Sequence, residues 1–322
     1  MEEKLVTILN EMAEYLNIAQ MKKLQEVLLK NLAENAPQKA EISNAAYLQM
    51  FLDSKRIEGC SERTLQYYRV TVERLLQTVT TPIRKICTEE IREYLSGYQQ
   101  INGCSKVTVD NIRRNISSFF SWLEEEDYIL KSPMRRIHKI KTKQPVKEII
   151  SDEAIEQLRD HCACARDLAM IDLLYSTGMR VGELVNLNIA DVNFEARECV
   201  VFGKGDKERR VYFDAKAKLH LQDYLRSRTD ANPALFVTLD APFDRLKISG
   251  VEIRLRELGR ELNLDKIHPH KFRRTMATRA IDKGMPIEQV QKILGHSQIG
   301  TTMQYAIVNQ NNVKTSHQKF IA

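Results

Sequence analysis

Apolar residues recur at helical spacing along most of the chain. The first stripe runs at intervals of four and three residues through Leu5, Leu9, Met12, Leu16 and Ala19. This spacing places side chains on one face of a helix, and the face continues to Leu28. Residues 1 to about 33 are therefore predicted to form one amphipathic helix. The polar segment that follows contains Pro37, so residues 1–40 are expected to comprise this helix and a linker.

A second helical region is predicted for residues 41–131. Ser61 and Ser105 each stand directly before a run of helical periodicity, where a side-chain oxygen caps the first turn. Thr88 begins a further helix, which has acidic residues in its first turn. The helix after Ser105 has the clearest apolar face, formed by Val109, Ile112, Ile116, Phe119, Phe120 and Leu123. These patterns predict a small helical domain.

The composition changes sharply at the end of this region. The segment from 131 to 147 contains no acidic residue and these basic ones: Lys131, Arg135, Arg136, Lys139, Lys141, Lys143 and Lys147. Pro133 and Pro145 interrupt helix formation at its two ends. A basic interdomain linker at 132–150 suits contact with a phosphate backbone, and it suits a simply solvated linker equally well.

Residues 151–322 are predicted to form a second, mostly helical domain. Ser151 begins a helix, residues 168–175 form a buried helix, and residues 249–262 form a helix with a Ser249/Glu252 capping box. Residues 199–202 and 210–213 are predicted to be short strands that flank Gly-Lys-Gly at 203–205, which is typical of a β-hairpin. The expected fold class is therefore mainly α with a small β-hairpin or sheet.

Composition narrows the class of protein. Apolar residues make up 43% of the chain and charged residues 29%, which is typical of a soluble globular protein. The net charge of +6 favours an anionic partner but also fits an ordinary, mildly basic protein. Signal-peptide features and apolar stretches of about 20 residues are absent from the sequence, so a cytoplasmic location is expected. The six cysteines are expected to be reduced, and the spacing in His161-Cys162-Ala163-Cys164 does not suit a zinc site.

The first candidate chemistry lies after the predicted buried helix. Thr177 can cap the helix that carries Arg180, and Glu183 follows on the same face. Taken alone, such a pair is more often a local ion pair than a phosphate site held by a carboxylate. Lys204 lies between two glycines, where a backbone can approach a ligand closely, although an ordinary turn lysine is the commoner case.

A second candidate group begins where Pro269 predicts a helix start. His270 and Arg273 then share a face near a helix N-terminus, which favours anions. Taken separately, they fit a capping histidine and a solvated arginine. A metal pair made by His268 and His270 is disfavoured, because no carboxylate or cysteine lies nearby in the sequence.

The last candidates lie near the end of the chain. A helix is predicted to begin at Pro286 and to stop at Gly295, so that His296 follows directly after the stop. Tyr305 is expected on a last short helix. One tyrosine among eleven usually serves in packing, so Tyr305 alone indicates nothing.

Taken together and in this order, these residues resemble the active site of tyrosine recombinases of the phage integrase type. The shared motifs are Thr-Gly-x-Arg-x-x-Glu at 177–183, Gly-Lys-Gly at 203–205, His-x-x-Arg at 270–273, Leu-Gly-His-Ser at 294–297 and the final Tyr305. The resemblance covers residues 44 to about 310 and does not explain residues 1–40. It implies a helical, SAM-like core-binding domain at 41–131 and a tyrosine-recombinase catalytic domain with a C-terminal tail at 151–322. Many relatives have histidine where this chain has Arg274, a position that often varies.

The resemblance also implies a reaction. Tyr305 attacks the scissile phosphate, forms a 3′-phosphotyrosyl bond and releases a 5′-hydroxyl. A tyrosine needs an acceptor for its proton, and His270 is the expected acceptor or relay. Lys204 is expected to protonate the leaving 5′-oxygen. No metal and no nucleotide cofactor is expected, because the covalent bond conserves the phosphodiester energy for rejoining.

The remaining motif residues are expected to act on the phosphate itself. Arg180 and Arg273 can grip its non-bridging oxygens and offset the charge that grows on them. His296 is expected to donate a hydrogen bond to the same group. Glu183 is expected to hold Arg180 or the His270 region in place.

Duplex DNA is the partner that the resemblance implies. The two domains would clamp it, with contacts from Arg63, Tyr67, Lys106, Asn111 and Arg114 in the helical domain and Lys139, Lys141 and Lys143 in the linker. The resemblance further implies a homo-tetramer on two DNA sites that exchanges strands through a Holliday junction. It also implies a role in mobile-element integration or excision in the bacterial nucleoid, accessory DNA-bending proteins as further partners, and no membrane.

Two other functions fit part of the same pattern. A type IB topoisomerase shares the Arg, Lys, Arg, His and Tyr chemistry, but the helical domain and the Leu-Gly-His-Ser segment favour recombination. A DNA-binding homologue without catalysis would have a broken site, whereas every motif position is filled in this chain.

Overall fold

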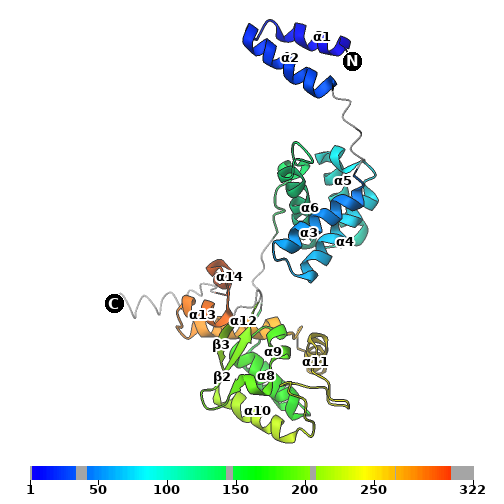
Figure 1. Cartoon of the computed structure of the whole chain (residues 1–322). Helices are drawn as coiled ribbons and strands as arrows, with labels where there is room; N and C mark the ends of the chain where they lie inside the picture. Colours follow the sequence, from blue (N-terminus) through cyan, green and yellow to red (C-terminus); the bar gives the residue numbers. More distant parts are fainter. Residues whose placement is uncertain (1, 34–41, 143–147, 204–207, 265, 306–322) are drawn as a thin grey trace, which may run out of the picture. The chain divides into compact units, whose positions relative to one another are not determined.

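The computed structural model describes residues 2–33, 42–142, 148–203, 208–264 and 266–305. The chain divides into two compact units, residues 1–144 and 145–322. Both are built mainly from helices, with one small antiparallel sheet in the second unit, so the predicted fold class is confirmed (Figure 1). Within the described ranges, each helix is too short or too polar to cross a lipid bilayer.

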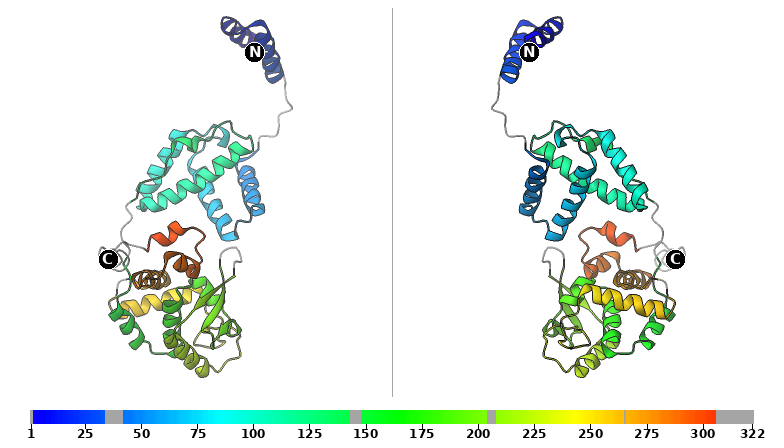
Figure 2. Two further views of the ribbon diagram at one scale, coloured as in Figure 1. Left: turned by 90° about the vertical axis from the view of Figure 1, so that its left-hand side faces the viewer. Right: turned by 90° about the vertical axis from the view of Figure 1, so that its right-hand side faces the viewer.

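The N-terminal segment is a helical hairpin, so the prediction of a single helix is wrong. Helix α1 spans Glu2–Met12 and α2 spans Ile18–Ala33, and the two lie side by side (Figures 1 and 2). The Asn17 side chain accepts the Gln20 N–H at 3.0 Å, and the Gln20 side chain accepts the Asn17 N–H at 3.1 Å. This reciprocal capping starts a new helix and overrides the continuous apolar periodicity.

The rest of the first unit is a bundle of four helices. They are α3 (Asn44–Ile57), α4 (Glu62–Thr78), α5 (Thr88–Asn102) and α6 (Lys106–Glu125), with 3-10 turns at Ile83–Lys85 and Pro133–Arg136. Ser61 and Ser105 cap α4 and α6 as predicted. The core is strongly aromatic, with Phe51 in contact with Phe119 and Trp122.

The first part of the predicted linker packs on this bundle. Met134 is buried in the bundle core, and Ile137 and Ile140 pack against it. The Ile140 N–H donates to the Asp110 carboxylate of α6 at 3.0 Å. The backbone is therefore tied to α6 at a point flanked by Lys139 and Lys141.

The second unit surrounds the buried helix α8 (Ala165–Thr177). Around it lie α7 (Asp152–Asp160), α9 (Val181–Asn186), α10 (Ala215–Ser227), α11 (Ile248–Glu261), α12 (Pro269–Asp282), α13 (Ile287–Leu294) and α14 (Ile299–Met303), with a 3-10 turn at Ile189–Asp191. Helices α10 and α12 pack directly on α8 (Figure 1). The clustering of α8 with α12 and α13 brings together motifs that are distant in the sequence.

The sheet has the antiparallel order β1-β2-β3. Its strands are β1 (Val192–Asn193), β2 (Glu198–Phe202) and β3 (Glu208–Tyr212). The predicted pair of strands is therefore present, with a short third strand added at the edge of β2. Val201 pairs with Arg209, which places Arg209 close to the start of β3.

Two capping predictions in this unit are wrong. Helix α11 begins at Ile248 after Lys247, so Ser249 lies inside the first turn and forms no capping box with Glu252. Thr177 ends α8 and its hydroxyl accepts the Met179 N–H at 3.2 Å, so it does not cap α9. That cap position belongs to Arg180.

Candidate active site

Gly178 ends the helix that leads into the site and has a backbone conformation that favours glycine. It ends α8 with φ of 61°, a left-handed conformation that other residues rarely adopt. An added Cβ would also lie 2.2 Å from Cε of Met276 on α12. The Gly178 carbonyl accepts from Arg273 of α12 at 2.7 Å.

Two arginines bind one carboxylate. Arg209 donates to both oxygens of Glu183, at 2.5 and 2.7 Å, and Arg180 donates to one of them at 2.9 Å. The Arg180 backbone N–H donates to the same carboxylate at 2.7 Å. Burial opposes ionisation of Glu183, but the hydrogen bonds from Arg209 and Arg180 outweigh it and lower the pKa of this carboxyl. Glu183 is therefore ionised and positions Arg180.

The C-terminal end of α13 holds the same arginines and a third one, Arg273. The carbonyls of Ile293, Leu294 and Gly295 accept from Arg209 (2.9 Å), Arg273 (2.5 Å) and Arg180 (3.3 Å) respectively. The last carbonyls of a helix have no partner within it and carry the negative end of its dipole, which suits cations. Gly295, with φ of 63°, ends the helix as predicted.

Arg273 is the most deeply buried of the three arginines, with 2% of its surface exposed. It donates to the Gly178 and Leu294 carbonyls, and its Nη2 lies 3.0 Å from Nε2 of His296. Burial, together with repulsion from Arg180, lowers the pKa of Arg273 to about 10. Three guanidinium groups around the one carboxylate of Glu183 leave uncompensated positive charge, so the site is suited to an anion.

His296 is an acceptor in this arrangement. A guanidinium only donates, so Nε2 of His296 must be unprotonated where it meets Arg273. Its Nδ1 then carries the proton and lies 2.8 Å from the hydroxyl of Thr302, a fully buried residue of α14. Burial and the charges of Arg273, Arg180 and Arg209 lower the pKa of His296 to about 4. The imidazole is therefore neutral near pH 7.

Tyr305 lies beside this histidine. The two rings stack with centroids 6.0 Å apart and planes inclined by 26°. Tyr305 follows α14, and its backbone N–H donates to the Thr302 carbonyl at 2.9 Å. It packs on a small apolar cluster that includes Ala277 and Leu294. The phenol is thus placed within the electrostatic influence of Arg273.

His270 lies on the first turn of α12, and the predicted start at Pro269 is present. Its side chain is open to solvent on one side and partly covered by neighbouring residues. Partial burial and the nearby charges of Arg273 and Arg180 lower its pKa. A neutral imidazole that is accessible to solvent and close enough to interact with Arg273 and Arg180 can take up a proton.

The structure therefore brings Arg180, Glu183, His270, Arg273, His296 and Tyr305 together. Lys204, on the β2–β3 connection, lies outside the described residues. Sequence reasoning missed Arg209 and Thr302. The Arg209 position shortly after the Gly-Lys-Gly turn was a weak signal, and nothing in the sequence marked Thr302 as a partner of His296.

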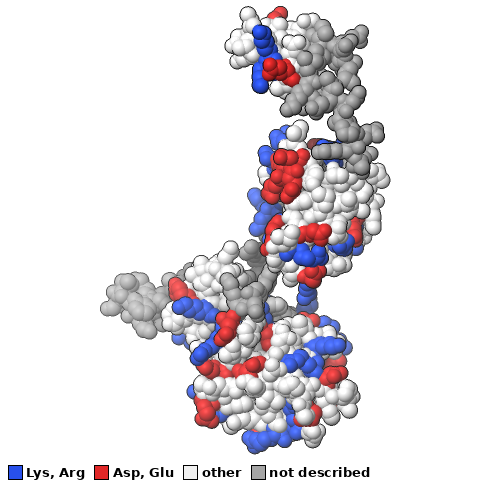
Figure 3. Space-filling view, in the orientation of Figure 1, with Lys and Arg blue, Asp and Glu red and all other residues white. Residues whose placement is uncertain are grey.

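The positive charge of the site is local. On the face drawn in Figure 3, basic and acidic side chains are interspersed over the second unit rather than gathered into one patch. Helix α8 also contributes buried ion pairs: Arg166 binds Asp167 of the same helix at 2.7 Å, and Asp172 binds Arg159 of α7 at 2.6 Å. Asp167 also binds Arg254 at 2.6 Å, so two arginines share this carboxylate as two share Glu183. Arg273 of the site differs, because it donates to the carbonyls of Gly178 and Leu294 and contacts His296.

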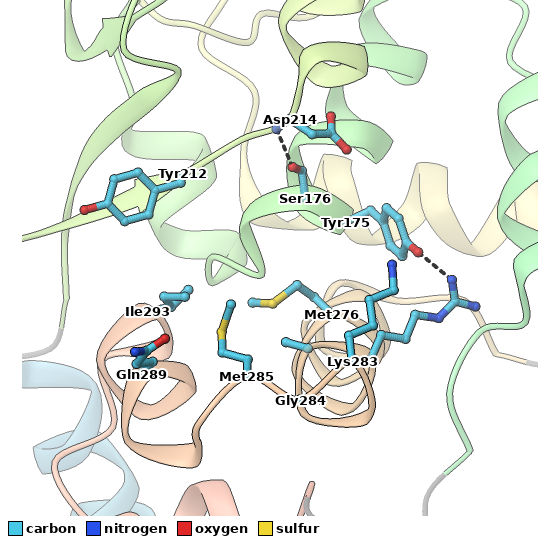
Figure 4. Close-up of a pocket in the computed structure, with 12 residues that line it drawn as sticks. Tyr175, Ser176, Tyr212, Asp214, Met276, Lys283, Gly284, Met285, Gln289 and Ile293 are labelled. Atoms are coloured by element: carbon cyan, nitrogen blue, oxygen red, sulfur yellow. Dashed lines mark hydrogen bonds between the residues drawn. The ribbon is translucent and has the colours of Figure 1, made fainter. Parts of the chain in front are cut away.

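A cavity of about 660 Å³ lies next to the site but does not contain it. Its walls come from the end of α8, from β3 and from α12 and α13 (Figure 4). Met276, Met285 and Ile293 give it an apolar side, and Tyr175 and Tyr212 add aromatic rings (Figure 4). Met276 and Met285 also pack against the cluster that contacts Tyr305.

The candidate DNA contacts of the first unit lie on two adjacent helices. Arg63 and Tyr67 are exposed on the first half of α4. Exposed Lys106 and Arg114 and half-buried Asn111 lie on the first half of α6. The helices are joined where Asn115 of α6 donates to the Thr71 hydroxyl of α4 at 3.1 Å.

Two linker lysines share this neighbourhood. Lys139 and Lys141 are exposed on either side of Ile140, which is bonded to Asp110 of α6. Arg114 acts electrostatically on the same carboxylate. Lys143 lies outside the described residues.

Comparison with known proteins gives matches to both units. Residues 146–312 match the phage integrase family, and residues 47–130 match the phage integrase N-terminal SAM-like domain. The chain is 30% identical over 287 residues to tyrosine recombinase XerC of Thermodesulfovibrio yellowstonii, covering 85% of this chain and 95% of the relative. It is 29% identical over 294 residues to XerC of Oceanobacillus iheyensis, with the same coverage.

Solved structures share the fold. The Tn1549 transposon integrase in complex with a circular intermediate DNA matches with a TM-score of 0.72 at 19% identity, covering 85% of this chain and 98% of that one. The XerH recombinase bound to a palindromic difH substrate matches with a TM-score of 0.67 at 19% identity, covering 99% and 95%.

Proposed function

The chain belongs to the phage integrase family and is a tyrosine site-specific recombinase, and we propose that it exchanges strands between two duplex DNA sites through a covalent bond to Tyr305. The observation that carries this proposal is the group of three arginines gathered around the single carboxylate of Glu183 beside that tyrosine. Such a site stabilises a phosphate whose charge grows during attack.

In the proposed reaction, Tyr305 Oη attacks the scissile phosphorus. A bond forms between Oη and phosphorus, and the bond from phosphorus to the 5′-oxygen breaks. The tyrosine proton passes to neutral His270, and Lys204 supplies a proton to the leaving 5′-oxygen. Attack of a 5′-hydroxyl from the second site reverses these steps and rejoins the strand, so the number of phosphodiester bonds is conserved.

Arg180 and Arg273 are proposed to hold the non-bridging oxygens. Each has donors left over, because a guanidinium carries five N–H groups. Glu183 and Arg209 keep Arg180 in place, and the carbonyls of Gly178 and Leu294 do the same for Arg273. The phosphate thus meets donors that are already oriented, and less reorganisation is needed during the reaction.

The predicted donation from His296 to the phosphate requires a tautomer change. In the structure its Nε2 accepts from Arg273. When Arg273 turns to a phosphate, the His296 proton can move to Nε2, and the Thr302 hydroxyl can donate to Nδ1 in its place. Thr302 suits this exchange because a hydroxyl both donates and accepts.

Assembly on DNA is proposed to use both units and several copies. Arg63, Tyr67, Lys106, Asn111 and Arg114, with Lys139, Lys141 and Lys143, are proposed to contact the duplex. Four copies on two sites would supply the four strand cleavages of a complete exchange.

The similar proteins also suggest a biological setting for this recombinase. XerC recombinases are similar in sequence, and the XerH recombinase and a transposon integrase share this fold. Integration or excision of a mobile element in the bacterial cytoplasm is the setting we propose, with DNA-bending proteins as accessory factors.

Covalent capture tests the proposal. The protein would be incubated in excess EDTA with nicked suicide duplexes made from genomic DNA of the source organism, and denatured complexes would be isolated. We expect a protein–DNA adduct whose DNA-bearing peptide contains Tyr305, and no adduct for Tyr305→Phe, which removes one oxygen and little volume. An adduct on another residue, or one that needs a divalent ion, would overturn the mechanism.

A further inference from the structure

The N-terminal hairpin lacks a dry core of its own. Among its side chains that the structure describes, residues 7 to 28, none is fully buried. Its inner seam is only half-buried and consists of Leu9, Met12, Leu16, Met21, Leu24 and Leu28. Larger apolar groups are exposed around it, with Ile8 38%, Tyr15 77% and Ile18 81% exposed. Two short helices bury too little surface to be stable alone, so a further surface must cover this seam.

The charges of the hairpin are divided between its helices. Helix α1 carries Glu2, Glu3 and Glu11 against one lysine, and Glu14 follows it. Helix α2 carries Lys22, Lys23 and Lys30 against one glutamate. The hairpin is thus acidic along one helix and basic along the other. Its net charge is close to zero, and a polyanion such as DNA is a poor partner for the acidic half.

A second copy of the hairpin can cover the half-buried apolar seam and can also match the opposite charges of the two helices. In a two-fold arrangement the same surface faces itself, so α1 of one copy can lie along α2 of the other. Acidic α1 then meets basic α2 twice, and the four helices enclose both half-buried seams as in a four-helix bundle. We propose that residues 2–33 are a self-association module that pairs two copies of this chain.

The pairing has a consequence for the whole protein. Residues 34–41 join the module to the helical bundle of the first unit. The proposed pairing does not involve the residues around Tyr305. Paired modules raise the local concentration of a second protomer, which favours occupation of two adjacent binding sites. Because self-association is measured without DNA, this proposal can fail independently of the recombination chemistry.

Charge reversal on the full-length chain tests the proposal. One variant carries Glu11→Lys and Glu14→Lys, and the other carries Lys22→Glu and Lys23→Glu. Sedimentation velocity without DNA should show a dimer for the native chain and roughly tenfold weaker self-association for each variant, because like charges then face each other. An equimolar mixture of the two variants should recover the dimer, since acidic and basic helices are again complementary.

A matched control reverses charges elsewhere. Asp223→Lys with Arg226→Glu changes an exposed pair on α10 and should leave the dimer unchanged. Tyr305→Phe should also dimerise normally. A native chain that stays monomeric at all concentrations would overturn the proposal, as would mixed variants that fail to recover the dimer. Loss of binding to a separate DNA sequence on deletion of residues 2–33, with no change in self-association, would instead assign the hairpin to DNA.

Discussion

The two units differ in how their buried charged side chains are paired. In the helical unit the described core is apolar and aromatic around Phe51, Phe119 and Trp122, and its buried carboxylate Asp110 is matched by Arg113. In the second unit Glu183 is shared by two arginines while Arg273 lies buried beside them. An excess of buried cations lowers the stability of a fold unless an anion balances their charge. The comparison teaches that the buried charges of the first unit are matched within its fold, whereas those of the second unit leave an excess of cations that suits an anion.

The largest expected effect comes from removing a cation from the site. Arg273→Ala or Arg180→Ala should slow formation of the covalent adduct by roughly 100- to 1,000-fold, because each removes a donor to the developing charge. Arg114→Ala in the helical unit should weaken binding with little change in the cleavage rate at saturating protein. Single-turnover cleavage at several protein concentrations separates the two effects. An equal fall in cleavage rate for variants of both units would contradict the assignment of catalysis to the second unit and of binding to the first.

The second prediction compares the two buried carboxylates. Glu183→Gln should lower the free energy of unfolding by about 3–5 kcal/mol, because it leaves two arginines without their anion. Asp110→Asn should cost less, since Asp110 serves one guanidinium and one backbone N–H. Trp122 is the only tryptophan and is buried in the helical unit, so its fluorescence reports that unit while circular dichroism reports both. A larger decrease for Asp110→Asn would contradict the account.

The third prediction concerns pH. The pKa of His296 falls from its ordinary 6.5 to about 4 in the folded protein, so the folded state binds this proton less readily than the unfolded chain. Its contribution to stability is therefore complete above pH 6.5 and is lost as the pH falls toward 4. The melting temperature, followed by circular dichroism, should fall as the pH is lowered across this window. His296→Asn should make this fall smaller. The Trp122 signal should respond less, because Trp122 is buried in the first unit and His296 belongs to the second.

The smallest effect is expected from the basic segment. Lys139→Ala with Lys141→Ala should reduce the slope of log affinity against log salt concentration by roughly two units, one for each phosphate that a lysine no longer neutralises. Titration of a DNA duplex at several salt concentrations measures this slope. Arg226→Ala on α10 is the matched control and should leave it unchanged. An unaltered slope for the double variant would mean that the segment is only solvated.

Sequence patterns could predict the elements whose signals are local. Ser61 and Ser105 stand at helix starts and Gly295 at a stop, and the structure has them there. The motif residues around Tyr305 could be grouped only through family resemblance. Asn17 divides the first helix because its side chain forms a capping box with Gln20, a local signal that the apolar stripe concealed.

The missed residues depend on tertiary structure. Arg209 reaches Glu183 from a strand 26 positions away, and periodicity carries no information about such a pairing. Thr302 becomes important only because Gly295 turns the chain so that His296 faces α14. The chemistry of a site made from chain ends and turns is therefore harder to predict than the helices that support it.

The central claim is that the arginines act on the negative charge of the scissile phosphate. Replacing a non-bridging oxygen of that phosphate by a methyl group makes it neutral. The decisive measurement is the rate of covalent adduct formation by Arg273→Ala on the native phosphate and on this methylphosphonate. The account predicts that the neutral substrate restores much of the variant's rate relative to the unaltered protein. Equal impairment on both substrates would contradict it.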